Sequence, residues 1–126
     1  MHTLNKDIYL LAACLSALAG FVDAIGFLYL GGYFISFMSG NSTRLVVAFV
    51  GHDIQAFGLL AGIIFLFVMG AMLGALVRHF SKSPPVATSV LVLLTVLLSC
   101  AAISAELGFG MIAIALITIA MGAENS

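Results

Sequence analysis

The sequence contains a 24-residue run, Ile54–Val77, that carries no charged side chain. A helix of this length is about 36 Å long at 1.5 Å per residue, which is enough to cross ~30 Å of hydrocarbon. The whole chain shares this character, because 63% of its residues are hydrophobic and 7% are charged. A soluble domain usually has about 25% charged residues. The run therefore predicts an all-α protein embedded in a lipid bilayer.

Three further apolar segments predict a polytopic transmembrane bundle that forms a single membrane domain over residues 1–126. We expect a first transmembrane helix at Ile8–Leu30, another at Val86–Ala105, and a shorter apolar helix at Met111–Met121. The first two are each about 20 residues or longer, as a helical span requires. The lipid bilayer is thus the first partner that the sequence predicts.

A secretory signal peptide is the alternative interpretation of the first apolar segment. Lys6 precedes an apolar stretch, and Ala17–Ala19 imitates a cleavage site. However, Asp7 is unusual in the charged region of a signal peptide, and the apolar pattern continues past that site to Leu30. These two features favour a transmembrane helix.

The charged and reactive residues exclude several classes of function. The net charge is -1 and the four Lys and Arg residues are dispersed, which argues against a nucleic-acid partner. The chain lacks the Gly-x-Ser-x-Gly, Walker A and His-Glu-x-x-His motifs, so we do not expect an enzyme. We expect no metal or cofactor, because the two cysteines lie in apolar runs and the three histidines share no helix face.

The segment Gly31–Val50 is the one place where the apolar pattern breaks. Two glycines open it, and the polar stretch Ser39–Arg44 separates two short apolar runs. Neither run reaches the roughly 20 residues of a complete span. The pattern predicts an interrupted or re-entrant element, and neighbouring helices must cover it because lipid leaves backbone polar groups unsatisfied.

The positions of the basic residues predict the orientation of the chain. Arg78 and Lys82 share one short loop, which the positive-inside rule places in the cytoplasm. Lys6 suggests that the N-terminus is cytoplasmic as well. Both assignments hold if Gly31–Val50 enters the membrane and returns to the same side, and they fail if it crosses.

The candidate substrate site combines an acid in the first helix with the polar part of the broken element. Its residues are Asp23, Ser39, Gly40, Asn41, Ser42, Thr43 and Arg44. A charge at the centre of a transmembrane helix costs about 2.5–3.5 kcal/mol, so it usually has a partner or faces water. One interpretation is a structural ion pair of Asp23 with Arg44. In the other, Asp23 binds a coupling ion or proton and Arg44 binds a solute anion. A third places both at the interface, unpaired.

The polar cluster has the composition of a helix start. Ser, Asn and Thr are typical N-cap residues, and Gly40 permits a sharp turn. We expect a helix to begin near Asn41, with its free N–H groups and positive dipole end pointing into a small anion-selective pocket. Discontinuous helices bind substrates in this way in secondary transporters.

Four glycines at helical spacing predict close helix packing. They form the pairs Gly58–Gly62 and Gly70–Gly74, each with a spacing of four residues. Small residues at this spacing let helix backbones approach closely in lipid. We favour packing inside one chain over a dimer face, although a homo-oligomer stays open.

A short repeat links the first helix to the end of the chain. Gly20-x-x-Asp23-Ala24 matches Gly122-x-x-Asn125-Ser126 in the pattern Gly-x-x-[Asp/Asn]-small. The spacing encloses an odd number of crossings, as in inverted-repeat transporters. We expect residues 8–106 to be a first repeat and residues 107–126 to begin a second, in the N-terminal half of a longer protein. Glu106 and Glu124 should then lie at the membrane interface, near helix ends.

The segments Gly20–Gly32 and Phe34–Leu45 resemble the YoaK-like family of bacterial inner-membrane proteins. Ala120–Asn125 is similar to the start of the second half of that family, whose usual Met-Thr-Gly-type motif this chain lacks. The resemblance implies about six membrane spans and a permease-like protein of unknown function. Our leading hypothesis is transport of a small solute, with an anion as one candidate. The alternative is a non-transporting membrane scaffold that binds a protein through the glycine face.

Overall fold

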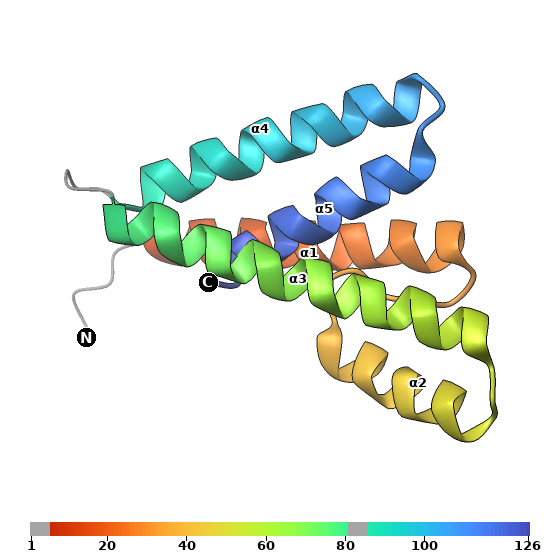
Figure 1. Ribbon diagram of the computed structural model, residues 1–126. Coiled ribbons are helices and arrows are strands. Elements are labelled where there is room, and N and C mark those ends of the chain that lie inside the picture. Colours follow the sequence, from red (N-terminus) through yellow and green to blue (C-terminus); the bar gives the residue numbers. More distant parts are fainter. Residues whose placement is uncertain (1–5, 81–85) are drawn as a thin grey trace.

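The chain folds into five α-helices in a computed structural model that describes residues 6–80 and 86–126 (Figure 1). The described residues contain no β-strand. The helices are α1 (Lys6–Leu30), α2 (Met38–Val50), α3 (Ile54–Phe80), α4 (Val86–Glu106) and α5 (Gly110–Glu124). The predicted all-α fold is confirmed. The predicted loop between α3 and α4, with Lys82, lies outside the described residues.

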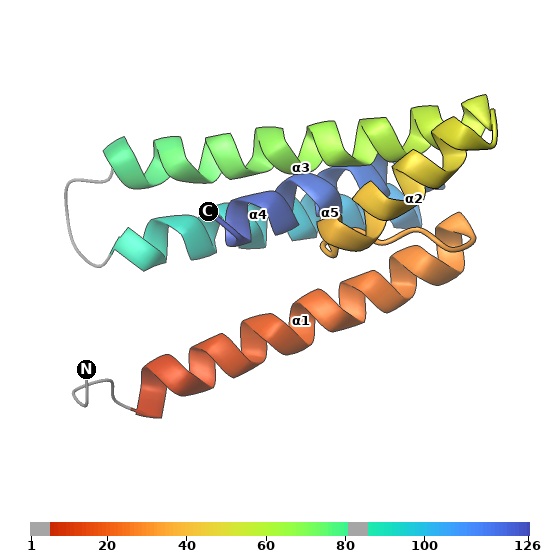
Figure 2. The same cartoon turned by 90° about the horizontal axis from the view of Figure 1, so that it is seen from below.

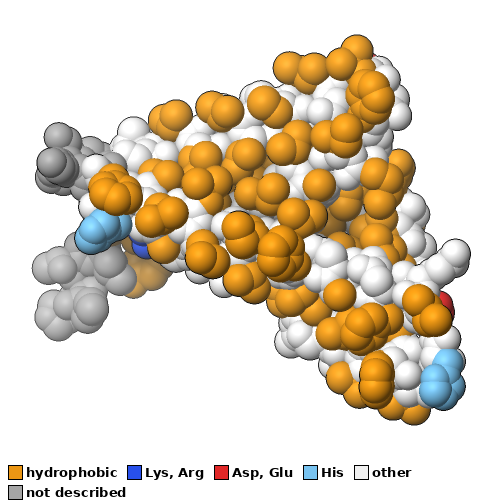
Figure 3. Space-filling model, viewed as in Figure 1, with side chains coloured by type: hydrophobic (Ala, Val, Ile, Leu, Met, Phe, Trp, Pro, Cys, Tyr) orange, Lys and Arg blue, Asp and Glu red, His pale blue; other side chains and the backbone are white. Residues whose placement is uncertain are grey.

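Three of the helices are long and apolar enough to cross a membrane. They are α1, α3 and the Thr88–Glu106 part of α4, whereas α5 is apolar but shorter. Hydrophobic side chains cover much of the face shown in Figure 3. Several large ones are almost fully exposed in the structure, such as Leu28 at 82% and Ile54 at 83%. Such a surface is stable in lipid and unstable in water. The fold is therefore that of a multi-pass membrane protein.

Helix α5 lies at the centre of the bundle. It packs against α3 along one side and α4 along the other, while α1 has few contacts and meets the bundle mainly through α5. Figure 2 shows α1 as a separate layer beside the other helices. The fully buried side chains include Met121 and Thr118 of α5 and Leu60 of α3. The position of α5 matters for the site, because its C-terminal end lies inside the bundle.

Glycines allow α3 and α5 to approach to backbone contact. A Cβ atom at Gly70 would overlap the carbonyl group of Ile119, and one at Gly122 would overlap the carbonyl oxygen of Phe67. A Cβ atom at Gly74 would lie 2.8 Å from the carbonyl oxygen of Ala123. This glycine pair thus packs within the chain.

The other predicted pair, Gly58 and Gly62, does not make a close helix contact. Gly58 and Gly62 have open space where a side chain would begin, and they line a cavity of about 170 Å³ between α3 and the first half of α5. The prediction of close packing at this pair is therefore wrong, for a geometric reason. The two helix backbones touch near Gly70 and leave a gap nearer their other ends, so these two glycines make no close contact.

The broken element re-enters the bundle and returns. Gly31 and Gly32 have positive φ angles of 82° and 116°, which glycine adopts without steric cost, and they turn the chain back at the end of α1. The following loop runs back beside α1, and α2 then leads to the end at which the loop entered (Figures 1 and 2). The start of α1 and the end of α3 consequently lie at the same end of the bundle. This is the geometry that the basic residues predict.

Candidate functional site

The re-entrant loop is attached to α1 through the carboxyl group of Asp23. Its Oδ1 accepts hydrogen bonds from the backbone N–H groups of Ile35 at 2.8 Å and Ser36 at 2.7 Å. Its Oδ2 accepts a third bond, from the Ser36 hydroxyl at 2.7 Å. Extended backbone at membrane depth needs such acceptors, because lipid offers none. Asp23 therefore replaces the water that would otherwise bind this loop.

Asn41 joins the loop to α2. Its side chain is fully buried, accepts a bond from the backbone N–H of Phe34 at 3.0 Å, and donates one to the carbonyl oxygen of the same residue at 2.6 Å. One amide group thus satisfies both backbone polar atoms of a loop residue. The loop is thereby held at both sides, by an acid on α1 and an amide on α2.

The start of α2 differs from the prediction. The helix begins at Met38, three residues before Asn41, and its N-cap residue Phe37 makes no side-chain capping bond. The reason is that the Asn41 side chain bonds the loop, while its backbone N–H bonds the Phe37 carbonyl and belongs to the first helical turn. The hydroxyl of Thr43 donates to the Ser39 carbonyl within the helix. The side chains of Asn41 and Thr43 thus bond to the preceding loop and within α2, and they do not cap the helix.

Arg44 does not pair with Asp23, so the predicted ion pair is corrected. The oxygens of Asp23 are occupied by the loop, and the described residues contain no ion pair of Arg44 with any carboxylate. The guanidinium carbon lies 6.0 Å from the ring centroid of Phe27 and 5.9 Å from that of Phe34. These distances are at the outer limit of a cation–π interaction. The charge of Arg44 remains open to a further partner.

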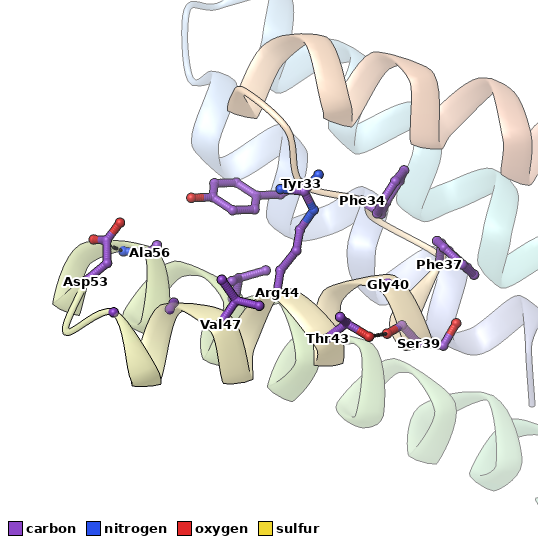
Figure 4. Close-up of a pocket in the computed structure, with 13 residues that line it drawn as sticks. Tyr33, Phe34, Phe37, Ser39, Gly40, Thr43, Arg44, Val47, Asp53 and Ala56 are labelled. Atoms are coloured by element: carbon purple, nitrogen blue, oxygen red, sulfur yellow. Dashed lines mark hydrogen bonds between the residues drawn. The ribbon is translucent and has the colours of Figure 1, made fainter.

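Arg44 projects into a pocket of about 870 Å³ between the loop, α2 and the start of α3 (Figure 4). Ser39, Gly40 and Thr43 line it as well, so the structure brings together four of the predicted site residues. The other three predicted residues, Asp23, Asn41 and Ser42, do not line it. Two of these hold the loop, and Ser42 is exposed elsewhere on α2.

Sequence reasoning missed the aromatic wall of this pocket and its second charged residue. Tyr33, Phe34 and Phe37 line the pocket from the loop. Asp53 lies at the opposite end, where its Oδ1 accepts a bond from the Ala56 backbone N–H at 3.1 Å at the start of α3. The clue in the sequence is that three aromatic residues lie within the six positions before Ser39.

These features together define a multi-pass α-helical membrane protein with a re-entrant loop and helix. The chain matches the family described as "Protein of unknown function (DUF1275)" over residues 11–126, and it belongs to this family. The match confirms the YoaK-like resemblance.

A curated relative supports the same assignment. A UPF0700 transmembrane protein of Rhizobium meliloti (strain 1021) is 56% identical over 43 residues, which cover 34% of this chain and 19% of the relative. The matched region thus spans less than a fifth of the length of that relative. No solved structure matches the chain.

Proposed function

We propose that the protein is a permease-like transporter of the bacterial inner membrane that moves a small anionic solute through the pocket beside α2. The observation that carries this proposal is the position of Arg44. Its guanidinium group projects into the pocket and pairs with no carboxylate among the described residues. An ionised group within a membrane segment is costly, and it usually marks a pathway for a substrate or an ion.

The chemistry of the pocket suits a small anion with an apolar part. Its volume of about 870 Å³ falls in the usual range of small-molecule sites. Arg44 offers planar N–H donors to an anionic group, and the rings of Tyr33, Phe34 and Phe37 offer an apolar surface. A Cβ atom at Gly32 would lie 3.7 Å from Nη1 of Arg44, an ordinary van der Waals distance, so the guanidinium group lies beside the backbone of Gly32.

The alternative of a scaffold has less support. It rests on a free glycine face on α3 and on a structural pair of Asp23 with Arg44. The backbone of α5 already covers Gly70 and Gly74, and Gly58 and Gly62 face a cavity between α3 and α5. Asp23 binds the loop instead of Arg44. Our proposal includes no chemical step, and it assigns no catalytic residue.

The first test of this proposal replaces Arg44 by glutamine. We expect phosphate or benzoate to raise the thermal unfolding temperature of the purified full-length protein, and the effect to fall at least about tenfold in Arg44→Gln, since a charged hydrogen bond contributes about 1.5–3 kcal/mol. Unfolding is followed by intrinsic fluorescence of the protein in detergent. The same variant should lose uptake of the stabilising anion in proteoliposomes.

Two variants serve as controls for this test. Arg44→Lys keeps the charge and loses the planar fork, so it should bind the anion more weakly than wild type and more strongly than Arg44→Gln. Arg78→Gln removes a cation at the far end of α3, outside the pocket, and should respond like wild type. Anion stabilisation that survives in Arg44→Gln, or disappears in Arg78→Gln, would contradict the proposed site.

A second prediction concerns orientation, because we propose a cytoplasmic N-terminus. Single cysteines are introduced by Asp7→Cys, His52→Cys and His79→Cys in a chain whose Cys14 and Cys100 are replaced by serine. All three positions are exposed. A membrane-impermeant maleimide should label position 52 in intact spheroplasts, and positions 7 and 79 after the membrane is opened. Labelling of positions 7 and 52 from the same side would mean that Gly31–Val50 crosses the membrane.

A further inference from the structure

A second, smaller cavity lies where the re-entrant loop, α1, α3 and α5 meet. It has a volume of about 160 Å³ and is lined by Ala19, Ser36, Phe67, Met121, Glu124 and Asn125. At 1.5 Å per residue, Ala19 lies about 16 Å from the end of α1 at Leu30, and Phe67 lies about 20 Å from the start of α3 at Ile54. Both depths are near the middle of a ~30 Å hydrocarbon layer. The cavity is therefore a polar site at the membrane midplane.

Glu124 gives the cavity an uncompensated acidic group. Its Oε2 atom is buried and accepts no hydrogen bond from any described residue. The sequence predicts an interfacial position for this residue, whereas the structure places it in one cavity with Ala19 of α1 and Phe67 of α3. An unpaired carboxylate in a low-dielectric interior is strongly unfavourable, so a buried one normally has a cation or a proton as its partner.

The carboxyl group of Asp23 adds negative potential next to this cavity, and one basic side chain, Arg78, lies in a neighbouring cavity. None of the six lining residues is basic. The carboxyl group of Asp23 lies directly behind Ser36, whose hydroxyl it binds at 2.7 Å. Arg78 shares a separate cavity of about 70 Å³ with Glu124, but no ion pair joins the two side chains in the described part of the chain.

The available ligand atoms suit a small hard cation. The Ser36 hydroxyl donates its hydrogen to Asp23, so its oxygen lone pairs are free for another partner. Glu124 contributes a carboxylate oxygen and Asn125 an amide oxygen, and neither group offers a soft ligand. One carboxylate in direct contact matches a monovalent charge. The volume exceeds the ~30 Å³ that one water molecule occupies, so an ion with residual water fits.

We propose that this cavity binds Na⁺ between Ser36, Glu124 and Asn125. The ion would neutralise Glu124 and link the re-entrant loop to the end of α5. Its role as a coupling ion rests on the proposed transport function, since secondary transporters place such ions at the midplane beside broken helices. Its binding does not rest on that function and can be measured without a solute.

The test is thermal unfolding of the purified full-length protein in detergent, with NaCl exchanged for choline chloride at constant ionic strength and pH. We expect the unfolding temperature to rise with the logarithm of the Na⁺ concentration above the dissociation constant, by on the order of 5–10 °C at 100 times that constant. Glu124→Gln should abolish this rise. Glu106→Gln, which removes an exposed acid at the end of α4, should leave it unchanged.

A second variant keeps the proposal testable if Glu124→Gln does not fold. Asn125→Ala changes an exposed residue after the last helical turn and should weaken the apparent Na⁺ affinity at least about tenfold. Stabilisation that choline reproduces, or that both variants retain, would overturn the proposal. A lack of Na⁺ dependence with stabilisation at acid pH would overturn it in favour of a proton. A normal Na⁺ response without any anion response at Arg44 would disprove the transport pocket and leave this site standing.

Discussion

Gly70→Ala should strongly destabilise the protein and reduce the amount of folded protein in the membrane. A Cβ atom at this position would overlap the carbonyl oxygen of Ile119 and lie 2.8 Å from its carbonyl carbon. These are backbone atoms of α5, so the conflict is relieved only if the two helices separate. We expect a loss of about 3 kcal/mol, at the upper end of overpacking effects and larger than the ~1 kcal/mol that alanine gains in helix propensity. Unfolding in a denaturing detergent titration measures the loss.

The matched control is Gly58→Ala, which makes the same chemical change on the same helix. This position has no heavy atom within 4 Å of an added Cβ atom, so the variant should be neutral or up to ~1 kcal/mol more stable. Equal effects at positions 58 and 70 would show that the close α3–α5 contact contributes little. A stable Gly70→Ala protein would show the same.

The spans could be predicted from the sequence because their length and apolarity leave few alternatives. The segment expected at Ile8–Leu30 is the helix Lys6–Leu30, and the segment expected at Ile54–Val77 is the helix Ile54–Phe80. The segment expected at Val86–Ala105 continues by one residue, to Glu106. In each case a bilayer requires one continuous helix, and the first polar residues set its ends to within a turn.

The partners of the polar residues could not be predicted in the same way. From residue types alone, Arg44 is the natural partner of Asp23, since one is a base and the other an acid. In the structure the partners of Asp23 are the backbone N–H groups of Ile35 and Ser36, which no residue letter reveals. The general rule that buried loop backbone needs acceptors would have pointed to Asp23, because it is the acid nearest to the loop.

Glu124 shows a second limit of sequence reasoning. A glutamate near a helix end is normally placed at the interface. In the structure, Ala19 of α1 and Phe67 of α3 share a cavity with Glu124, so its surroundings depend on how these helices pack against α5. Residue types near the end of an apolar run do not reveal that packing.

Asp23→Ala should release the re-entrant loop from α1. The substitution leaves the backbone N–H groups of Ile35 and Ser36 without an acceptor, whereas the Ser36 hydroxyl can still reach the Ala19 carbonyl oxygen at 3.4 Å. Each unsatisfied buried donor costs about 1–3 kcal/mol, so we expect a loss of about 2–6 kcal/mol. Thermal unfolding in detergent should show this loss, and limited proteolysis should show new cleavage near residues 31–37.

Asp23→Asn separates the structural role of this residue from a role of its charge. The amide oxygen can accept both backbone bonds, and the amide N–H can donate to the Ser36 hydroxyl oxygen, so we expect a loss of only about 1 kcal/mol. If Asp23→Ala and Asp23→Asn are equally unstable, the loop depends on the negative charge and not on the acceptor geometry. If Asp23→Asn folds but no longer supports uptake, the charge serves transport in addition. Because the residue lies behind Ser36, this second outcome would also connect the loop anchor to the proposed Na⁺ site.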